Sequence, residues 1–410
     1  MLYSVRPCGC REPAGASSCR PGRFPVAPVA LLIRCHLVHS FGAVEYRRVT
    51  LTRGARITGA VLCAVLALMA LAWIVRDVRA ADGPVAVWEY WSGTANLRTG
   101  LRPATTSTTF VLLVAYIAAA VAALRSTAAA SVLVVTGIVT FALRLPGVWT
   151  VGDALAPEDL RDRALLTTYA ALAASVGLIV AGAAGRRPAP GGGARPLGPG
   201  RGAGVAALLL LGFQAVVFAG WEIRQPFVYP SNLYPAWFIG GRPLHTPLTE
   251  GPPGWVNAVL VLMFLVAAVG AVAGAVNARP LGLIAGGFVL CSGVLGVARA
   301  IHFDMFDGFA GMDIEGQLNL LSFVTSLLVG VAVIIVLARK GVERSPGGAT
   351  GPWGGPNSWG GDWGPPGPWG AQAPGGPGAQ GYPPAPGHPP VSGPPQGGGF
   401  GPPPSSPPRW

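Results

Sequence analysis

The sequence predicts an all-α protein, a polytopic bundle of about eight transmembrane helices followed by a disordered C-terminal tail. Two observations predict this class. Charged residues make up only 11% of the 410 residues, whereas soluble globular proteins carry about 25%. Hydrophobic residues make up 51% and are gathered in long blocks. Because a helix of roughly 20 apolar residues spans the bilayer core and satisfies its own backbone hydrogen bonds, we expect these blocks to be helices in a lipid bilayer.

Residues 1–48 differ from the rest of the chain in composition. They contain four of the six cysteines and two of the five histidines, and they show no helical periodicity. Their short apolar run lacks both the core and the cleavage site of a signal peptide. Two interpretations remain open: a disordered cytoplasmic leader, or a start codon assigned upstream of a true start near Val44 or Val49.

Eight apolar blocks follow, and we interpret each as one membrane span. The blocks cover residues 57–75, 108–124, 128–143, 164–184, 203–221, 255–276, 280–298 and 318–338. Only Arg125, Ser126 and Thr127 separate the second block from the third, so these two could instead form one re-entrant hairpin. The corresponding sixth and seventh blocks are longer and are broken by Asn277 to Pro280, which favours two complete spans.

The loops between the blocks alternate in charge. The net charge of +12 comes from basic residues beside the apolar blocks, so we interpret these residues as determinants of membrane orientation and not as a nucleic-acid-binding surface. The basic side carries Arg47, Arg48, Arg53, Arg56, Arg125, Arg186, Arg187, Arg279, Arg339 and Lys340. The acidic side carries Asp77, Asp82, Glu158, Asp159, Glu222, Glu250, Asp304, Asp307 and Glu315. The positive-inside rule places the basic side and both termini in the cytoplasm, with the protein in the cell membrane.

The C-terminal segment is a different kind of polymer from the apolar blocks. It consists mostly of Gly and Pro with scattered aromatic residues, and it cannot bury enough apolar area to fold. We expect a disordered cytoplasmic tail that either docks a cytoplasmic protein or serves as a spacer. The predicted domains are therefore a leader (1–48), a first four-helix unit (49–187), a linker (188–202), a second four-helix unit (203–340) and the tail (341–410).

The chain also shows signs of an internal duplication. The loops 76–108 and 222–254 have equal length, and each contains an aromatic residue followed three positions later by a tryptophan, Trp91 or Trp237. Arg144 aligns with Arg299 at the end of the third span of each unit. Since each unit has four spans, the two would keep the same orientation as a parallel repeat. The alternative is eight unrelated helices with coincidental spacing.

Six residues are candidates for contacts with a ligand or a lipid headgroup. Arg144 and Arg299 end spans at the outer interface, where a charge must pair, reach water or face a cavity. Their alternative role is to pair with loop carboxylates, namely Asp153 for the first arginine and Asp304 or Asp307 for the second. The remaining candidates are Asp304, Asp307, Trp91 and Trp237. The two tryptophans could line a ligand cleft, although tryptophan also anchors helices at the headgroup level.

Metal, cofactor and catalytic sites are not expected. His302 lies near Asp304 and Asp307, but three ligands are not assembled and the first unit has no matching histidine, so a network of hydrogen bonds is favoured over a metal. No pair of histidines in the spans supports a haem, and the chain lacks the Walker, GxSxG and HExxH motifs. We therefore expect a protein that is not an enzyme and has no cofactor.

Three hypotheses for the function remain, in decreasing order of preference. The first is a structural or interaction protein of the cell envelope whose tail recruits a partner. The second is a permease or lipid-binding protein with a cavity between the two units. The third is an extracytoplasmic sensor that uses the Trp-rich loops. In layout the chain resembles actinobacterial polytopic membrane proteins that combine a helical core with a Gly/Pro-rich cytoplasmic tail, a resemblance that implies no site residue.

Overall fold

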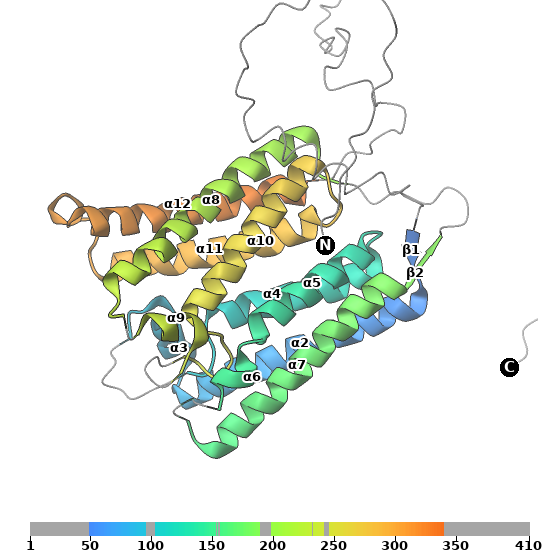
Figure 1. Cartoon of the computed structure of the whole chain (residues 1–410), viewed down its shortest axis with the longest axis horizontal. Helices are drawn as coiled ribbons and strands as arrows, with labels where there is room; N and C mark the ends of the chain where they lie inside the picture. Colours follow the sequence, from blue (N-terminus) through green and yellow to red (C-terminus); the bar gives the residue numbers. More distant parts are fainter. Residues whose placement is uncertain are drawn as a thin grey trace, which may run out of the picture. The chain divides into compact units, whose positions relative to one another are not determined.

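The computed structural model describes residues 49–95, 103–152, 154, 156–188, 198–231, 233–241 and 246–339. In this part of the chain eight helices are long and apolar enough to cross a membrane, which confirms the predicted multi-pass helical class. They are α2 (Arg53–Ala80), α4 (Ser107–Arg125), α5 (Ala129–Arg144), α7 (Glu158–Ala184), α8 (Arg201–Val228), α10 (Pro253–Ala273), α11 (Ala278–His302) and α12 (Ile314–Ala338) (Figure 1). The predicted leader and tail lie outside the described residues.

The short elements gather at the two ends of the bundle. The elements α3 (Pro84–Ser92), α6 (Gly147–Thr150), α9 (Tyr234–Ile239) and η2 (Phe309–Gly311) follow α2, α5, α8 and α11. Because successive long helices alternate in direction, these four connections lie at one end, which we call the short-helix end. At the other end, the strand end, β1 (Val49–Leu51) pairs in antiparallel fashion with β2 (Arg186–Pro188).

Polar side chains fix several helix termini. The hydroxyl of Thr52 accepts a hydrogen bond from the Ala55 amide at 3.3 Å and caps α2. The Asp313 carboxylate accepts one from the Gly316 amide at 2.9 Å and caps α12. Such N-terminal caps satisfy amides that have no partner within the helix. At the other end of α12, Arg279 donates to the Leu337 carbonyl at 2.8 Å. The Asp313 cap explains why α12 begins four residues before the predicted block.

The long helices pair in a corresponding manner in residues 49–188, the first half, and residues 198–339, the second half. In the first half α2 packs mainly on α4, and α5 packs mainly on α7. In the second half α8 packs mainly on α10, and α11 packs mainly on α12. A Cβ atom at Gly293 of α11 would lie 2.2 Å from the Leu327 amide nitrogen of α12. Only glycine therefore permits this close approach of the two helices.

The helices carry large apolar side chains on the outside of the bundle as well as in its core. Leu133, Phe264 and Val289 are fully buried in one continuous core. In contrast, Leu68 and Val216 are 65% and 70% exposed. Exposed apolar side chains along whole helices would be unfavourable in water but are solvated by lipid tails. The protein is therefore a multi-pass membrane protein that associates with a lipid bilayer.

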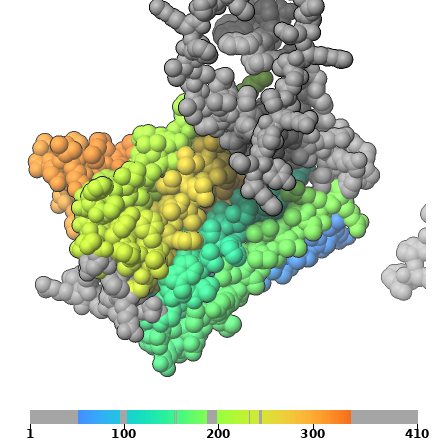
Figure 2. All heavy atoms as spheres, in the orientation of Figure 1, coloured from blue at the N-terminus to red at the C-terminus, as the bar shows by residue number. Residues whose placement is uncertain are grey.

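The two halves meet along a seam to which both contribute helix faces and short helices. Helix α11 contacts α4, α5 and the short helix α3, and α10 contacts α5. Figure 2 shows this seam where the yellow surface of α10 meets the teal surface of the first half. The indole of Trp149, in α6, donates to the Ile239 carbonyl of α9 at 2.8 Å, and Trp255 of α10 donates to the Ala142 carbonyl at 2.8 Å. The short helix α3 thus packs against α11, and the short helices α6 and α9 contact each other across the seam.

Candidate ligand cavity

A cavity of about 380 Å³ opens at the short-helix end of the second half. The first half contributes α3 and the beginning of α4, and the second half contributes α8, α10, α11, α12 and residues 246–251. The polar side chains that line it are Ser92, Ser107, Thr108, Thr246, Glu250, Asn257, Ser292 and Arg299. The apolar ones include Trp91, Phe218, Leu260, Phe288 and Phe323. A polar mouth with an aromatic lining suits a small ligand that has both polar and apolar parts.

Glu250 is held at the cavity by the residue that precedes it. The amide of Thr249 donates to the Ala104 carbonyl at 3.0 Å, and the hydroxyl of Thr249 donates to the same oxygen at 2.7 Å. The Thr249 hydroxyl also lies 3.2 Å from that of Thr109. These contacts tie residues 246–251, which belong to the second half, to the start of α4 in the first half. Glu250 consequently lies between the two halves.

The Ala104 anchor is itself fixed by a buried carboxylate. Asp77, in the last turn of α2, is 1% exposed. One of its oxygens accepts hydrogen bonds from the Thr105 amide at 2.7 Å and the Thr105 hydroxyl at 2.6 Å. The other oxygen accepts from Arg76 at 2.7 Å. Charge-assisted hydrogen bonds are stronger than neutral ones, so Asp77 positions the backbone that in turn holds Thr249 and Glu250.

The environment of Glu250 makes its charged form more costly than it is in water. Burial raises the pKa of the Glu250 carboxyl group above its ordinary value, because a charged carboxylate loses hydration in such a place. The hydroxyls of Thr106 and Thr108, and more weakly the charge of Arg144, lower this pKa without cancelling the rise. A cation that entered the cavity would stabilise the ionised carboxylate in the same way.

Arg299 brings a positive charge to the same cavity. It lies in the last turn of α11, and its guanidinium group packs against Gly93, where an added Cβ would lie 3.6 Å from Nη1. Gly93 has a φ of 73°, a conformation that favours glycine. The ion pairs among the described residues join Arg76 to Asp77, Arg161 to Glu158 and Arg224 to Glu315. Neither Glu250 nor Arg299 belongs to these pairs.

A network around Glu222 positions the cavity wall. The Asn257 amide group and the Trp237 indole both donate to the Glu222 carboxylate, the second at 2.9 Å. The Trp237 ring lies 5.1 Å from that of Tyr229, centroid to centroid. This network joins α8, α9 and α10. Trp237, one of the sequence candidates, therefore supports the cavity through Asn257 and does not line it.

The first half has a corresponding but filled hollow of only about 20 Å³. It is lined by residues of α2, α4, α5 and α7, and by Thr249 from the second half. Arg144 reaches into this hollow and donates to the Thr249 carbonyl. Tyr116 fills it, is 1% exposed, and has its hydroxyl 3.1 Å from that of Thr140. The neighbouring residues Thr249 and Glu250 thus face different hollows.

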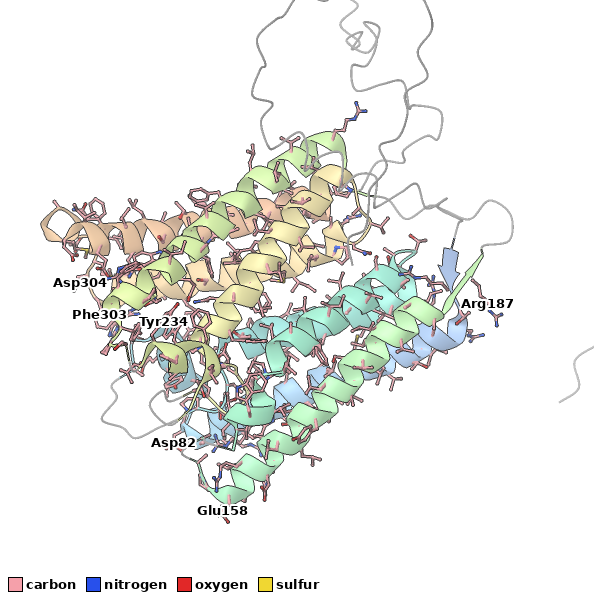
Figure 3. All side chains as sticks on the ribbon, in the orientation of Figure 1. Asp82, Glu158, Arg187, Tyr234, Phe303 and Asp304 are labelled. Carbon is pink, nitrogen blue, oxygen red and sulfur yellow. The ribbon has the colours of Figure 1, made fainter. Side chains whose placement is uncertain are left out.

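The structure brings two of the six sequence candidates, Trp91 and Arg299, to the open cavity. Asp304 and Asp307 are exposed at the turn after α11, where Figure 3 shows Asp304 beside Phe303. Neither pairs with Arg299 among the described ion pairs, and Asp153 lies outside the described residues. Among the residues that are described, no three His, Cys, Asp or Glu side chains lie close enough to hold a metal ion.

Glu250 is the functional candidate that the sequence did not single out. It lies in a Pro- and Gly-rich loop without periodicity, next to the Gly-Pro-Pro-Gly stretch that begins α10. The available signal was its position: an acidic residue shortly before an apolar block, at the same end of the bundle as Arg144 and Arg299.

Comparisons with known proteins identify no relative of this chain. No family model, curated protein or solved structure matches the chain. The residues of the cavity therefore carry the functional proposal alone.

Proposed function

We propose that this multi-pass membrane protein binds a small ligand in the cavity between its two halves, as a permease or lipid-binding protein does. The observation that carries the proposal is an open cavity, lined by both halves, that contains a carboxylate and a guanidinium group outside the described ion pairs. Its volume of about 380 Å³ falls within the range of small-molecule sites, roughly 300–1,000 Å³.

The other hypotheses receive no comparable support. Recruitment of a cytoplasmic partner depends on the tail, which lies outside the described residues, so this role stays a prediction. A sensor function of the Trp-rich loops also stays a prediction, although a ligand that contacts Trp91 would serve both a sensor and a permease. We further propose binding or movement of the ligand without chemical conversion, since the sequence lacks the catalytic motifs considered above.

We propose that the strand end faces the cytoplasm. Arg53, Arg125 and Arg279 lie at that end, and Figure 3 shows Arg187 there, away from Asp82 and Glu158 at the opposite side of the bundle. The positive-inside rule supports this orientation in the cell membrane. The cavity would then open to the extracytoplasmic side.

We also propose that the chain is an internal duplication of one four-helix unit. The indole of Trp73 in α2 donates to the hydroxyl of Thr167 in α7 at 3.2 Å, and the indole of Trp221 in α8 donates to that of Ser322 in α12 at 3.2 Å. Thr167 and Ser322 stand at corresponding places in the two units, each directly after a pair of leucines near the start of the fourth span. Equivalent helices are thus joined by equivalent hydrogen bonds, which supports a parallel repeat of two four-helix units.

Cysteine accessibility tests whether the cavity admits solutes. Cys291 lines the cavity, whereas Cys63 is 0% exposed in the core. With Cys8, Cys10, Cys19 and Cys35 replaced by serine, a small water-soluble thiol reagent should label Cys291 and leave Cys63 unmodified.

Two controls make the labelling experiment decisive. The denatured protein should be labelled at both sites, and a Cys291→Ser variant should lose the label of the native protein. A membrane-impermeant reagent added outside intact cells should label the same site if the orientation is right. If Cys291 in the native protein reacts no faster than Cys63, the proposed cavity is closed and the function fails.

A further inference from the structure

The cavity contains two opposite charges that come from different segments of the chain. Glu250 belongs to the segment tied to α4, and Arg299 belongs to the last turn of α11. Both line the same space. In an environment of reduced polarity a charge without a partner is costly, so an occupant that supplies a counter-charge to each residue gains from both. A ligand with a single charge would satisfy one residue and leave the other unpaired.

The other residues that line the cavity indicate the properties of the uncharged part of such a ligand. Phe218, Phe288 and Phe323 offer apolar surface in the same cavity. Asn257 donates an amide hydrogen to Glu222, which leaves its carbonyl oxygen as an acceptor for a donor in the cavity. The volume of about 380 Å³ is near the lower end of the range of roughly 300–1,000 Å³ for small-molecule sites. It suits a small polar molecule or a lipid headgroup, with any acyl chains left outside.

We propose that the cavity binds a zwitterion, with the cationic group of the ligand at Glu250 and its anionic group at Arg299. This inference rests on the proposed function, because it needs a cavity that admits solutes. Two sources share this chemistry: a free ammonium-containing acid, or the headgroup of a lipid such as phosphatidylethanolamine. Arg144, across the 246–251 segment, also acts on Glu250 and lowers its pKa, and Arg299 lines the same cavity as Glu250.

The first test measures the electrostatic potential at Cys291. Two methanethiosulfonate reagents of similar size are compared, one with a trimethylammonium group and one with a sulfonate. Glu250→Gln should slow the cationic reagent relative to the anionic one, and Arg299→Gln should do the opposite. Arg161→Gln, a partly exposed arginine that pairs with Glu158 outside the cavity, serves as the matched control and should change neither rate. If neither cavity variant alters the ratio of the two rates, the two charges do not face the bound solute and the inference fails.

The second test uses phosphoethanolamine as the probe and protection of Cys291 from labelling as the readout. Phosphoethanolamine should protect at concentrations at least about tenfold lower than ethanolamine or inorganic phosphate, because each lacks one charged contact. Glu250→Gln should abolish the advantage over phosphate, and Arg299→Gln the advantage over ethanolamine. Equal protection by all three compounds, or by none of them, would overturn the zwitterion assignment.

A third experiment, in lipid nanodiscs, distinguishes a lipid headgroup from a free zwitterion as the ligand. The protein is placed in nanodiscs of phosphatidylethanolamine or of phosphatidylglycerol. Slower labelling of Cys291 in phosphatidylethanolamine alone indicates a headgroup, and equal labelling with retained protection by phosphoethanolamine indicates a free zwitterion. Labelling of Cys291 without protection by any zwitterion refutes this inference and leaves the cavity intact, whereas an unreactive Cys291 refutes the proposed function itself.

Discussion

Asp77 is the buried carboxylate on which the geometry of the cavity depends, and its replacement by asparagine gives a sharp test. Asparagine keeps one oxygen, so it can accept from Thr105 or from Arg76 but not from both as the carboxylate does. Its amide group would moreover confront the Thr105 donors. Hydrogen bonds to a charged group contribute about 1.5–3 kcal/mol each. The loss of one or two therefore predicts that Asp77→Asn lowers the free energy of unfolding by about 2–5 kcal/mol.

The assay is reversible unfolding of the purified protein in detergent, with Asp82→Asn as the matched control. Asp82 lies five residues further along the chain, is exposed, and has a φ of 54°, a conformation that asparagine tolerates. The control should therefore change stability by less than about 0.5 kcal/mol.

Two further measurements separate the network from a general loss of stability. Thr105→Ala should cost less in the Asp77→Asn background than in the native protein, because the two residues share their hydrogen bonds. Asp77→Asn should also alter the labelling rate of Cys291 under conditions where the protein remains folded, since Thr105 precedes the segment that borders the cavity. Equal stability of the Asp77→Asn and Asp82→Asn variants would refute the chain of contacts from Asp77 to Glu250.

Three other predictions concern the cores of the two halves and the pH dependence of binding. Tyr116→Ala should enlarge the hollow of the first half and lower the free energy of unfolding by about 3–5 kcal/mol, measured in the same assay, because a fully buried aromatic ring is removed. Ser326→Ala should cost about 1–3 kcal/mol because it leaves the buried Gln214 amide without its acceptor; the double variant with Gln214→Leu should recover most of this loss. Protection by phosphoethanolamine should weaken as the pH falls through the raised pKa of Glu250, because a cation favours the ionised carboxylate. The difference between the native and Glu250→Gln pH profiles isolates this effect from the titration of the ligand, and identical profiles would contradict it.

The sequence predicts the helices well because lipid imposes a simple requirement on them. Each apolar block must be long enough to cross the bilayer and must satisfy its own amides, and these two conditions identify all eight spans. The helix ends are less predictable. Helix α2 continues beyond residue 75 to Ala80, because Asp77 in that last turn has partners in the chain, Arg76 and Thr105, that a hydropathy pattern does not show.

The candidate site was predictable only in part, for a related reason. Arg299 and Trp91 stand out in the sequence because a charge or an indole at the membrane interface needs an explanation. Glu250 lies among other acidic loop residues, and only contacts with Ala104, which is distant in the sequence, place it between the two halves. The hydrogen-bond partner of Arg144 was unpredictable for the same reason, since the Thr249 carbonyl that it binds belongs to the other half.

The small β1–β2 ladder has a consequence for the biogenesis of the protein. It joins Leu51, just before α2, to Arg186, just after α7, so the strand pair that joins the two ends of the first half can form before residue 198 leaves the ribosome. Domains generally fold in the order of synthesis, and the first four helices can accordingly assemble early. The binding cavity is complete only after α12 has been synthesised, because α12 supplies Phe323. Chains truncated before that helix would reach the bilayer with an ordered first half and no place for a ligand.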